Sequence, residues 1–134
     1  MSLSEYQPRY FDVSEHDDVV VATFSMIQIN DEANIEELGH ELFALVDQFD
    51  CHKVVLNLSG VEYITSSVVG KIITMHRKLH RMDGNLIVSE LTKGVHDVLS
   101  ASRLLTYFVV TETQAEAVDS LRAAPLESDE SEPS

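Results

Sequence analysis

The run VVLNL at residues 54–58 constrains the fold more than any other segment of the chain. Four of its five residues are apolar, and they do not alternate with polar residues as they would in a strand with one face in water. A near-continuous apolar run is typical of a central strand that is covered on both faces. The segment therefore predicts a strand in the middle of an α/β sheet, joined to its neighbours by helical crossovers.

Two longer segments with helical periodicity flank this strand. In the first, apolar residues recur every three or four positions after a cap at Asp31 or Asn34, which predicts an amphipathic helix. A second helix is predicted over about residues 66–82. Asp83 and Gly84 are turn residues that end it, and Gly84 tolerates a positive φ at a C-terminal cap.

The remaining segments complete an alternating pattern of strands and helices. A hairpin is predicted for residues 10–15 and 19–24, which are β-rich and joined by a polar turn. The other expected elements are strands over 85–90 and 106–110, a helix over 93–102, and a helix capped by Thr113 that ends before Pro125. This order predicts a mixed sheet of four or five strands with about four helices, and right-handed β-α-β units build its parallel part.

Length and composition indicate a single domain. The 134 residues are 44% hydrophobic and suit one core. We expect a flexible N-terminus over residues 1–9, the folded domain over 10–122, and an acidic disordered tail over 123–134, because the tail has almost no apolar residues to offset ordering entropy. No apolar run is long enough to span a membrane, no secretion signal is recognised, and Cys51 has no disulfide partner, so a cytoplasmic protein is expected.

The charge of the chain is unevenly distributed. A net charge of −14 argues against a nucleic-acid partner. Residues 51–110 nevertheless hold seven basic residues against four acidic ones. Four of these basic residues lie in the predicted second helix: Lys71, Arg77, Lys78 and Arg81. They form either a solvated helix face or a surface that complements an acidic protein partner.

Sequence signatures of enzymes are absent. The chain has no G-x-S-x-G, no G-x-x-x-x-G-K-[ST] and no G-x-G-x-x-G. His76 and His80 stand one helical turn apart, but no third ligand follows at a local spacing, and exposed polar histidines are the better interpretation. Three glutamates of the first helix are interpreted as its solvated face: Glu36, Glu37 and Glu41. We therefore expect no enzyme activity, no metal, no cofactor and no small-molecule substrate.

Three hydroxyl residues, Thr65, Ser66 and Ser67, stand in succession where the second helix begins. A single hydroxyl is enough to cap a helix, so the other side chains are available for a second role. A phosphate at this position would meet free backbone amides and the positive end of the helix dipole. It would also add about −1.5 to −2 charges to a small polar surface. The segment is therefore suited to a phosphorylation switch that leaves the fold intact.

The chain resembles a known family in the stretch from VVLNLSGVEYITSSVVG to NLIVSELTKGVHDVLSASRLL, and more weakly over about residues 10–122. It is similar to the STAS domain of bacterial anti-sigma-factor antagonists, which has a mixed sheet of four or five strands with about four helices. A family motif that reads approximately D-S-[ST]-G-[LIV]-G falls on residues 65–70. The resemblance implies that Ser67 is the phosphorylation site, with Ser66 and Thr65 as alternatives.

The resemblance also implies partners. An anti-sigma factor that is a serine protein kinase would bind the unphosphorylated form at Thr65, Ser66, Ser67, Val68 and Lys71. Phosphorylation would release the kinase, and a cognate phosphatase would reset the cycle. The alternative is a constitutive STAS scaffold or adaptor that phosphorylation does not control. An enzyme with Ser66 or Ser67 as nucleophile is disfavoured because no local base accompanies them.

Three positions depart from the family pattern. Thr65 stands where the family usually has Asp, and Val68 stands where it usually has Gly. Val68 would place a β-branched side chain beside the phosphate acceptor and restrict the approach of a partner. Arg103 follows Ser102 where the family tends to have Ser-Gly.

Overall fold

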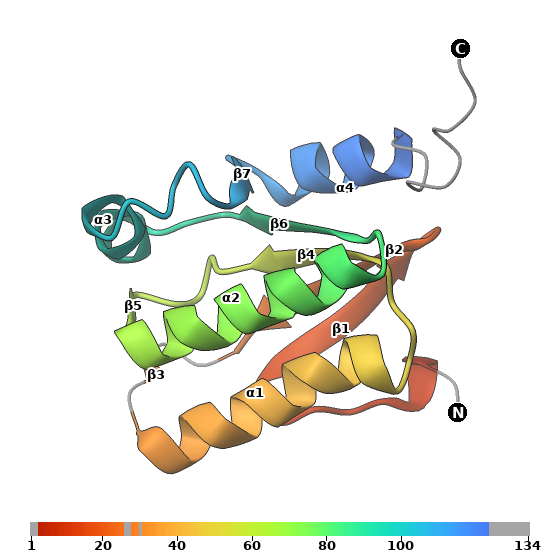
Figure 1. The fold of residues 1–134 in the computed structure, drawn as a ribbon, viewed down its shortest axis with the longest axis horizontal. Coiled ribbons are helices and arrows are strands. Elements are labelled where there is room, and N and C mark those ends of the chain that lie inside the picture. The colour runs from red at the N-terminus through yellow and green to blue at the C-terminus, as the bar shows by residue number, and fades with distance from the viewer. Residues whose placement is uncertain (1–2, 26–27, 30, 124–134) are drawn as a thin grey trace.

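The computed structural model describes residues 3–25, 28–29 and 31–123, and its centre is a five-stranded mixed sheet (Figure 1). The strand order is β1-β2-β4-β6-β7. These strands are β1 (Phe11–His16), β2 (Val19–Phe24), β4 (Lys53–Asn57), β6 (Asn85–Ser89) and β7 (Val109–Thr111). β1 is antiparallel to β2, and each later pair is parallel. The predicted α/β fold with a mixed sheet is confirmed.

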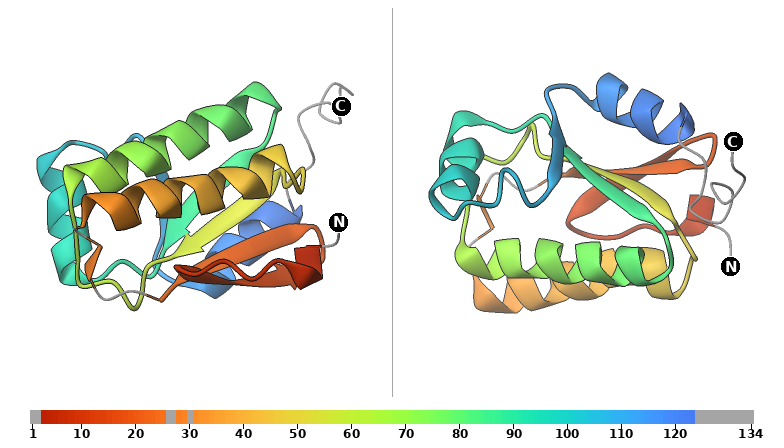
Figure 2. Two further views of the ribbon diagram at one scale, coloured as in Figure 1. Left: turned by 90° about the horizontal axis from the view of Figure 1, so that it is seen from below. Right: turned by 45° about the horizontal axis from the view of Figure 1, so that its top comes forward.

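In the described residues, four α-helices pack around the sheet, as predicted. They are α1 (Glu32–Asp47), α2 (Ser66–Arg81), α3 (Lys93–Ala101) and α4 (Gln114–Ala123). α1 and α2 lie side by side on one face of the sheet, and α4 lies on the other face (Figures 1 and 2). α3 packs against β5 (Tyr63–Ile64) at one end of the sheet. The result is a sheet between two helical layers.

Alternate residues of β4 enter two separate cores, which is why its sequence is apolar without alternation. Val54 and Leu56 belong to the core beneath α1 and α2, whereas Val55 belongs to the core beneath α4. The same alternation holds in β2 and β6. The smaller core consists of Val19, Val21, Val55, Ile87, Ala117, Val118 and Leu121.

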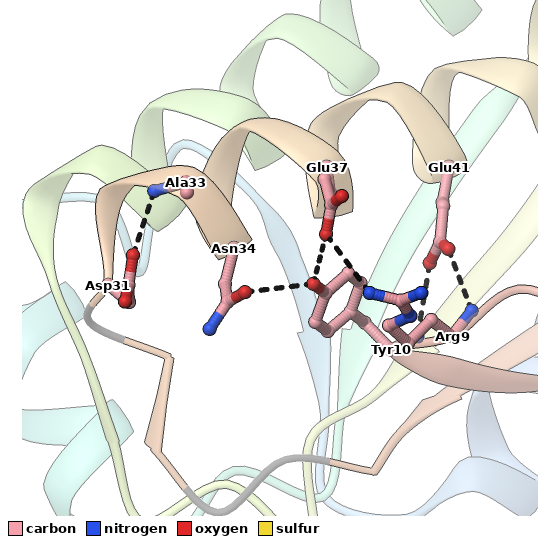
Figure 3. Close-up of polar contacts among 7 residues, drawn as sticks. All are labelled: Arg9, Tyr10, Asp31, Ala33, Asn34, Glu37 and Glu41. Atoms are coloured by element: carbon pink, nitrogen blue, oxygen red, sulfur yellow. Dashed lines mark hydrogen bonds and ion pairs between the residues drawn. The ribbon is translucent and has the colours of Figure 1, made fainter.

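Side-chain caps begin α1 and α4 at the predicted residues. The Asp31 carboxylate accepts a hydrogen bond of 2.9 Å from the amide of Ala33 (Figure 3). The Thr113 hydroxyl accepts from the amide of Glu116 at 3.1 Å, and the Glu116 carboxylate accepts from the Thr113 amide at 3.2 Å. This reciprocal pair is a capping box. Asn34, the alternative cap of α1, instead accepts a hydrogen bond of 2.9 Å from the Tyr10 hydroxyl.

Hydrogen bonds join the described part of the N-terminal segment to α1. Residues Leu3–Glu5 form a 3-10 helix, and the Tyr6 hydroxyl donates a hydrogen bond of 2.8 Å to the carbonyl of Glu41. The Glu41 carboxylate accepts from the amides of Arg9 and Tyr10 at 2.7 and 3.0 Å (Figure 3). Contacts to α1 thus extend into the segment expected to be flexible, residues 1–9, and its flexibility stays a prediction. Residues 124–134, which make up most of the predicted acidic tail, lie outside the described residues.

Three local features differ from the predictions. β7 begins at Val109 rather than at 106, because the chain turns before it and the amide of Phe108 bonds to the carbonyl of Leu104. A second, two-stranded parallel sheet joins β3 (Gln28–Ile29) to β5, and both strands are too short to leave a pattern in the sequence.

The turn after α2 also differs. The positive φ of 60° belongs to Asp83 and not to Gly84. Gly84 is required for another reason: a Cβ on it would lie 2.5 Å from the carbonyl oxygen of His52.

Gly94→Ala tests the packing of α3 against the segment that leads to α2. An added Cβ would overlap the backbone carbonyl oxygen of Glu62, so we expect a loss of about 1–3 kcal/mol in the free energy of unfolding, measured by urea denaturation. Gly70→Ala is the matched control, because nothing lies within 4 Å of its added Cβ. It should gain about 1 kcal/mol from helix propensity. Equal effects of the two substitutions would contradict this packing.

Candidate functional site

Three features fix the segment before α2: a strand pairing, a buried side chain and a hydrogen bond. β5 pairs with β3, and the side chain of Ile64 is buried. The Thr92 hydroxyl donates a hydrogen bond of 2.7 Å to the carbonyl of Val61. The start of α2 is therefore fixed relative to the sheet and to α3.

Thr65 caps α2. Its backbone is extended, with φ −97° and ψ 169°, and its Oγ1 accepts a long hydrogen bond of 3.4 Å from the amide of Val68. This assigns the cap, which the sequence left open among the three hydroxyl residues. It also explains the first departure from the family motif, because threonine and aspartate are both suited to this position. Thr65 thus provides the N-cap without the negative charge that an Asp would add.

Ser66 and Ser67 are both exposed in the first turn of α2. Among the residues that the structure describes, no hydrogen bond or ion pair engages either hydroxyl. Their amides belong to the first turn, whose N–H groups have no partner within the helix. The structure therefore brings the three predicted hydroxyl residues together and leaves the two serine side chains accessible to another protein.

Val68 does not lie on this surface. Its side chain is fully buried in the core beneath α1 and α2. The expectation that Val68 contacts a partner and restricts the approach to Ser67 therefore does not agree with its position. The third residue of the helix points inward, whereas Ser66 and Ser67 point outward, because successive helical residues are about 100° apart.

Ser67 borders a shallow cavity of about 240 Å³ between α1 and α2. The ionisable residues around it are Glu32, Glu36 and Lys71. Lys71 Nζ lies 3.0 Å from Glu36 Oε2, and its aliphatic stem lies against Gly39, where an added Cβ would be 2.8 Å from Cδ. Lys71 therefore lies beside Ser67, but it is half-buried and paired with α1.

Glu32 and Glu36 are site residues that the sequence pattern did not indicate. They precede Ser67 by more than thirty residues, and the pattern around Glu36 indicated only a solvated helix face. The small residue Gly39 in the otherwise well-packed α1 was the available signal of a close helix–helix contact.

The four basic residues of α2 divide into two pairs. Lys71 and Lys78 turn toward α1: Lys78 Nζ lies 3.1 Å from Asp47 Oδ2 and 5.3 Å from the centre of the Phe43 ring. Arg77 and Arg81 are exposed and make no ion pair with a described carboxylate. Lys71 and Lys78 thus form ion pairs with α1, whereas Arg77 and Arg81 form an exposed basic surface.

The expected exposure of the histidine pair is correct for His80 and wrong for His76. His76 is half-buried and lies 4.9 Å from Tyr107 and 5.9 Å from Phe108 between ring centres. Burial lowers its pKa, and the neighbouring charges of His80 and Arg77 lower it further. Within the described ranges, no group of three or more His, Cys, Asp or Glu side chains is placed to hold a metal ion.

Comparison with known proteins gives the family. The model of the STAS domain family matches residues 10–117. The chain belongs to the STAS domain family. A relative in Bordetella bronchiseptica, BtrV, is named as an anti-sigma factor antagonist and is 32% identical over 92 residues, which are 69% of this chain and 78% of the relative.

Solved STAS structures share the fold. A Thermotoga maritima protein, named as an anti-sigma factor antagonist, has a TM-score of 0.74 and 24% identity, with 84% of this chain and 94% of that chain covered. The Bacillus cell fate determinant SpoIIAA, solved in its phosphorylated form, has a TM-score of 0.63 and 20% identity, with 84% and 99% covered. Across the described part of this STAS domain, no helix is long and apolar enough to cross a membrane.

The departure at Arg103 has a backbone consequence. Arg103 has φ 61°, which is the left-handed conformation that glycine adopts without steric cost. The position where the family tends to have Gly therefore keeps the backbone conformation that favours Gly, although this chain places Arg there.

Thr65→Ala and Ser66→Ala separate the cap from the spare hydroxyls. Thr65→Ala removes the side chain that accepts from the Val68 amide and should lower the free energy of unfolding by about 1 kcal/mol. Ser66→Ala removes an exposed hydroxyl without a described partner and should change it by less than about 0.5 kcal/mol. Urea denaturation measures both values. A larger loss for Ser66→Ala than for Thr65→Ala would show that the cap is assigned to the wrong residue.

Proposed function

We propose that this STAS protein is an anti-sigma-factor antagonist, a binding module that sequesters an anti-sigma serine kinase and is released when Ser67 is phosphorylated. The observation that carries the proposal is the division of roles in the first turn of α2. Thr65 caps the helix, so the exposed Ser67 hydroxyl has no structural task among the described contacts. A modification of Ser67 therefore changes the surface without removing a capping interaction.

The first turn of α2 is suited to carry a phosphate. Ser67 is the second residue of the helix, where backbone amides without intrahelical partners and the helix dipole favour negative charge. Lys71 follows Ser67 by one turn, on the same side of the helix. Its ammonium is within reach of the cavity that Ser67 borders. These features support a phosphorylated form that remains folded.

The same phosphate would weaken partner binding through charge. It adds about −1.5 to −2 charges to a surface that already holds Glu32 and Glu36, only one of which is paired with Lys71. A kinase surface that accommodates the neutral serine would then meet a concentrated negative patch. Like-charge contacts across an interface cost several kcal/mol, which is enough to release a partner of ordinary affinity.

The relatives support this role. BtrV is named as an anti-sigma factor antagonist, and the SpoIIAA structure with the same fold was solved in a phosphorylated form. In this proposal the protein acts by binding and is the substrate of its partner rather than an enzyme. Neither serine hydroxyl has an imidazole or carboxylate within hydrogen-bonding distance among the described residues, whereas a catalytic serine is activated by such a base. A phosphatase would complete the cycle.

Intact-mass spectrometry tests the phosphorylation site. The cognate kinase with ATP and Mg²⁺ should add one phosphate to the wild-type chain and to Ser66→Ala, and none to Ser67→Ala. Ser66→Ala is the matched control because its hydroxyl is adjacent and also exposed. A phosphate that remains in Ser67→Ala, or that maps to a serine of residues 124–134, contradicts the assignment.

Calorimetric titration with the kinase separates a switch from a constitutive scaffold. Ser67→Asp introduces a charge and should weaken binding by roughly tenfold or more. Ser67→Asn has nearly the same shape without the charge and should bind much more tightly than Ser67→Asp. If Ser67→Asp binds as well as wild type, the protein is a scaffold or adaptor whose binding does not depend on phosphorylation.

A further inference from the structure

A hollow surface lies on the opposite half of α2 from Ser67. We call it the α2–β7 groove, and it is lined by His76, Arg77, His80, Arg81 and Tyr107, with a volume of about 620 Å³. Its floor is aromatic: Tyr107 is 41% exposed and packs at 5.1 Å against Phe108, between ring centres. Val109, at the start of edge strand β7, is 57% exposed. The groove therefore combines open apolar side chains with a basic rim.

The basic rim is unusual in so acidic a chain. The protein has nine Lys and Arg against 23 Asp and Glu. Six of the nine pair with carboxylates in the described residues: Arg9, Lys53, Lys71, Lys78, Lys93 and Arg122. The other three, Arg77, Arg81 and Arg103, make no ion pair with a described carboxylate, and two of them stand one turn apart in the groove.

An unpaired buried atom of His76 is a further sign that this groove binds another group. The Nδ1 of His76 is buried and has no hydrogen-bond partner among the described residues. Buried polar atoms are nearly always paired, so an unpaired one marks a place where a further group is expected. His76 lines the same groove as Arg77 and His80.

The segment after α4 is acidic and therefore complements the basic side chains of this groove. Residues 124–134 contain four acidic residues, Glu127, Asp129, Glu130 and Glu132, together with Leu126 and no basic residue. We propose that residues 124–134 dock in the α2–β7 groove of the same chain, with carboxylates on Arg77 and Arg81 and an apolar contact at Tyr107. This inference does not depend on phosphorylation of Ser67.

The connection is long enough. Arg122 Nε lies 2.9 Å from Asp17 Oδ2, so α4 ends beside the β1–β2 turn. β2 starts there at Val19, in register with Lys53 of β4 and through it with Asn85 of β6, four residues after Arg81. The end of α4 and the Arg81 end of the groove are thus at the same end of the sheet. Two strand spacings of ~5 Å separate β2 from β6, whereas eleven extended residues reach ~36 Å, which leaves length to round the sheet end.

Because residues 124–134 are covalently joined to α4, weak contacts are sufficient for them to dock in the groove. A segment joined by a short linker is present at an effective concentration in the millimolar range, so a few exposed ion pairs are enough to populate the docked form. Such pairs are screened by salt, so docking should decrease as ionic strength rises. When docked, the segment covers the basic rim and competes with an acidic segment of any other protein for this face.

Paramagnetic relaxation measured by NMR tests the proposal on the 134-residue chain. A nitroxide is attached at Ser131→Cys, and the native Cys51 should not react because its thiol is buried and burial raises its pKa to about 11. At low salt, the amide signals of Arg77, Arg81 and Tyr107 should lose at least about half of their intensity, and they should recover at ~0.5 M salt. Signals of α3, at the far end of the sheet, should not change.

Matched variants identify the contacts. Arg77→Gln combined with Arg81→Gln should restore the groove signals. Arg103→Gln, which removes the third arginine that makes no ion pair with a described carboxylate, should not. Neutralising the segment with Glu127→Gln, Asp129→Asn, Glu130→Gln and Glu132→Gln should have the same effect as the double arginine variant. Groove signals that stay at full intensity in the labelled wild-type background overturn the proposal.

A mixing experiment distinguishes docking of the segment in its own chain from docking in a second copy. Isotope-labelled protein without the nitroxide is combined with spin-labelled protein without isotope, so only contacts between chains broaden signals. Intramolecular docking predicts no broadening in this mixture. Broadening at the groove would mean that the segment binds a second copy, and the proposal would be wrong.

Discussion

The burial of β4 on both faces is the constraint on which the rest of the structure depends. All five residues of this strand are buried, so helices must cover both sides of it. Its last residue, Asn57, is a buried amide whose groups are paired with the Gln114 side chain at 2.7 Å and the Ser59 amide at 2.9 Å. These bonds connect the strand to α4 and begin the turn that leads through β5 to α2. The position of Ser67 therefore follows from the way the central strand ends.

The first turn of α2 contains both residues that stabilise the fold and residues that remain on the surface. Thr65 provides the cap, Val68 enters the core, and Ser66 and Ser67 remain on the surface of the same helical turn. Lys71 and Lys78 hold α2 against α1 through Glu36 and Asp47. A charge added at Ser67 thus acts on the surface, while the contacts that position α2 lie on its other sides.

Much of this architecture was predictable because it is local in sequence. Apolar periodicity gave α1 and α2, and the residues Asp31 and Thr113 marked helix starts that the structure confirms. What could not be predicted depends on contacts between distant residues. Glu41 binds the backbone of Arg9 and Tyr10, and Gly84 is needed because His52 approaches it, yet no local pattern encodes either contact. Likewise, the inward position of Val68 follows from where the cap falls, which three adjacent hydroxyls left ambiguous.

The central claim is that a phosphate on Ser67 ends partner binding while the fold stays intact. Hydrogen exchange of the phosphorylated and unphosphorylated proteins, each measured with and without the kinase, tests it most directly. The account predicts equal protection of the β4 and β6 amides in the two free forms, and added protection at the start of α2 by the kinase only in the unphosphorylated form. Loss of β4 and β6 protection on phosphorylation, or kinase protection of the phosphorylated form, would contradict it.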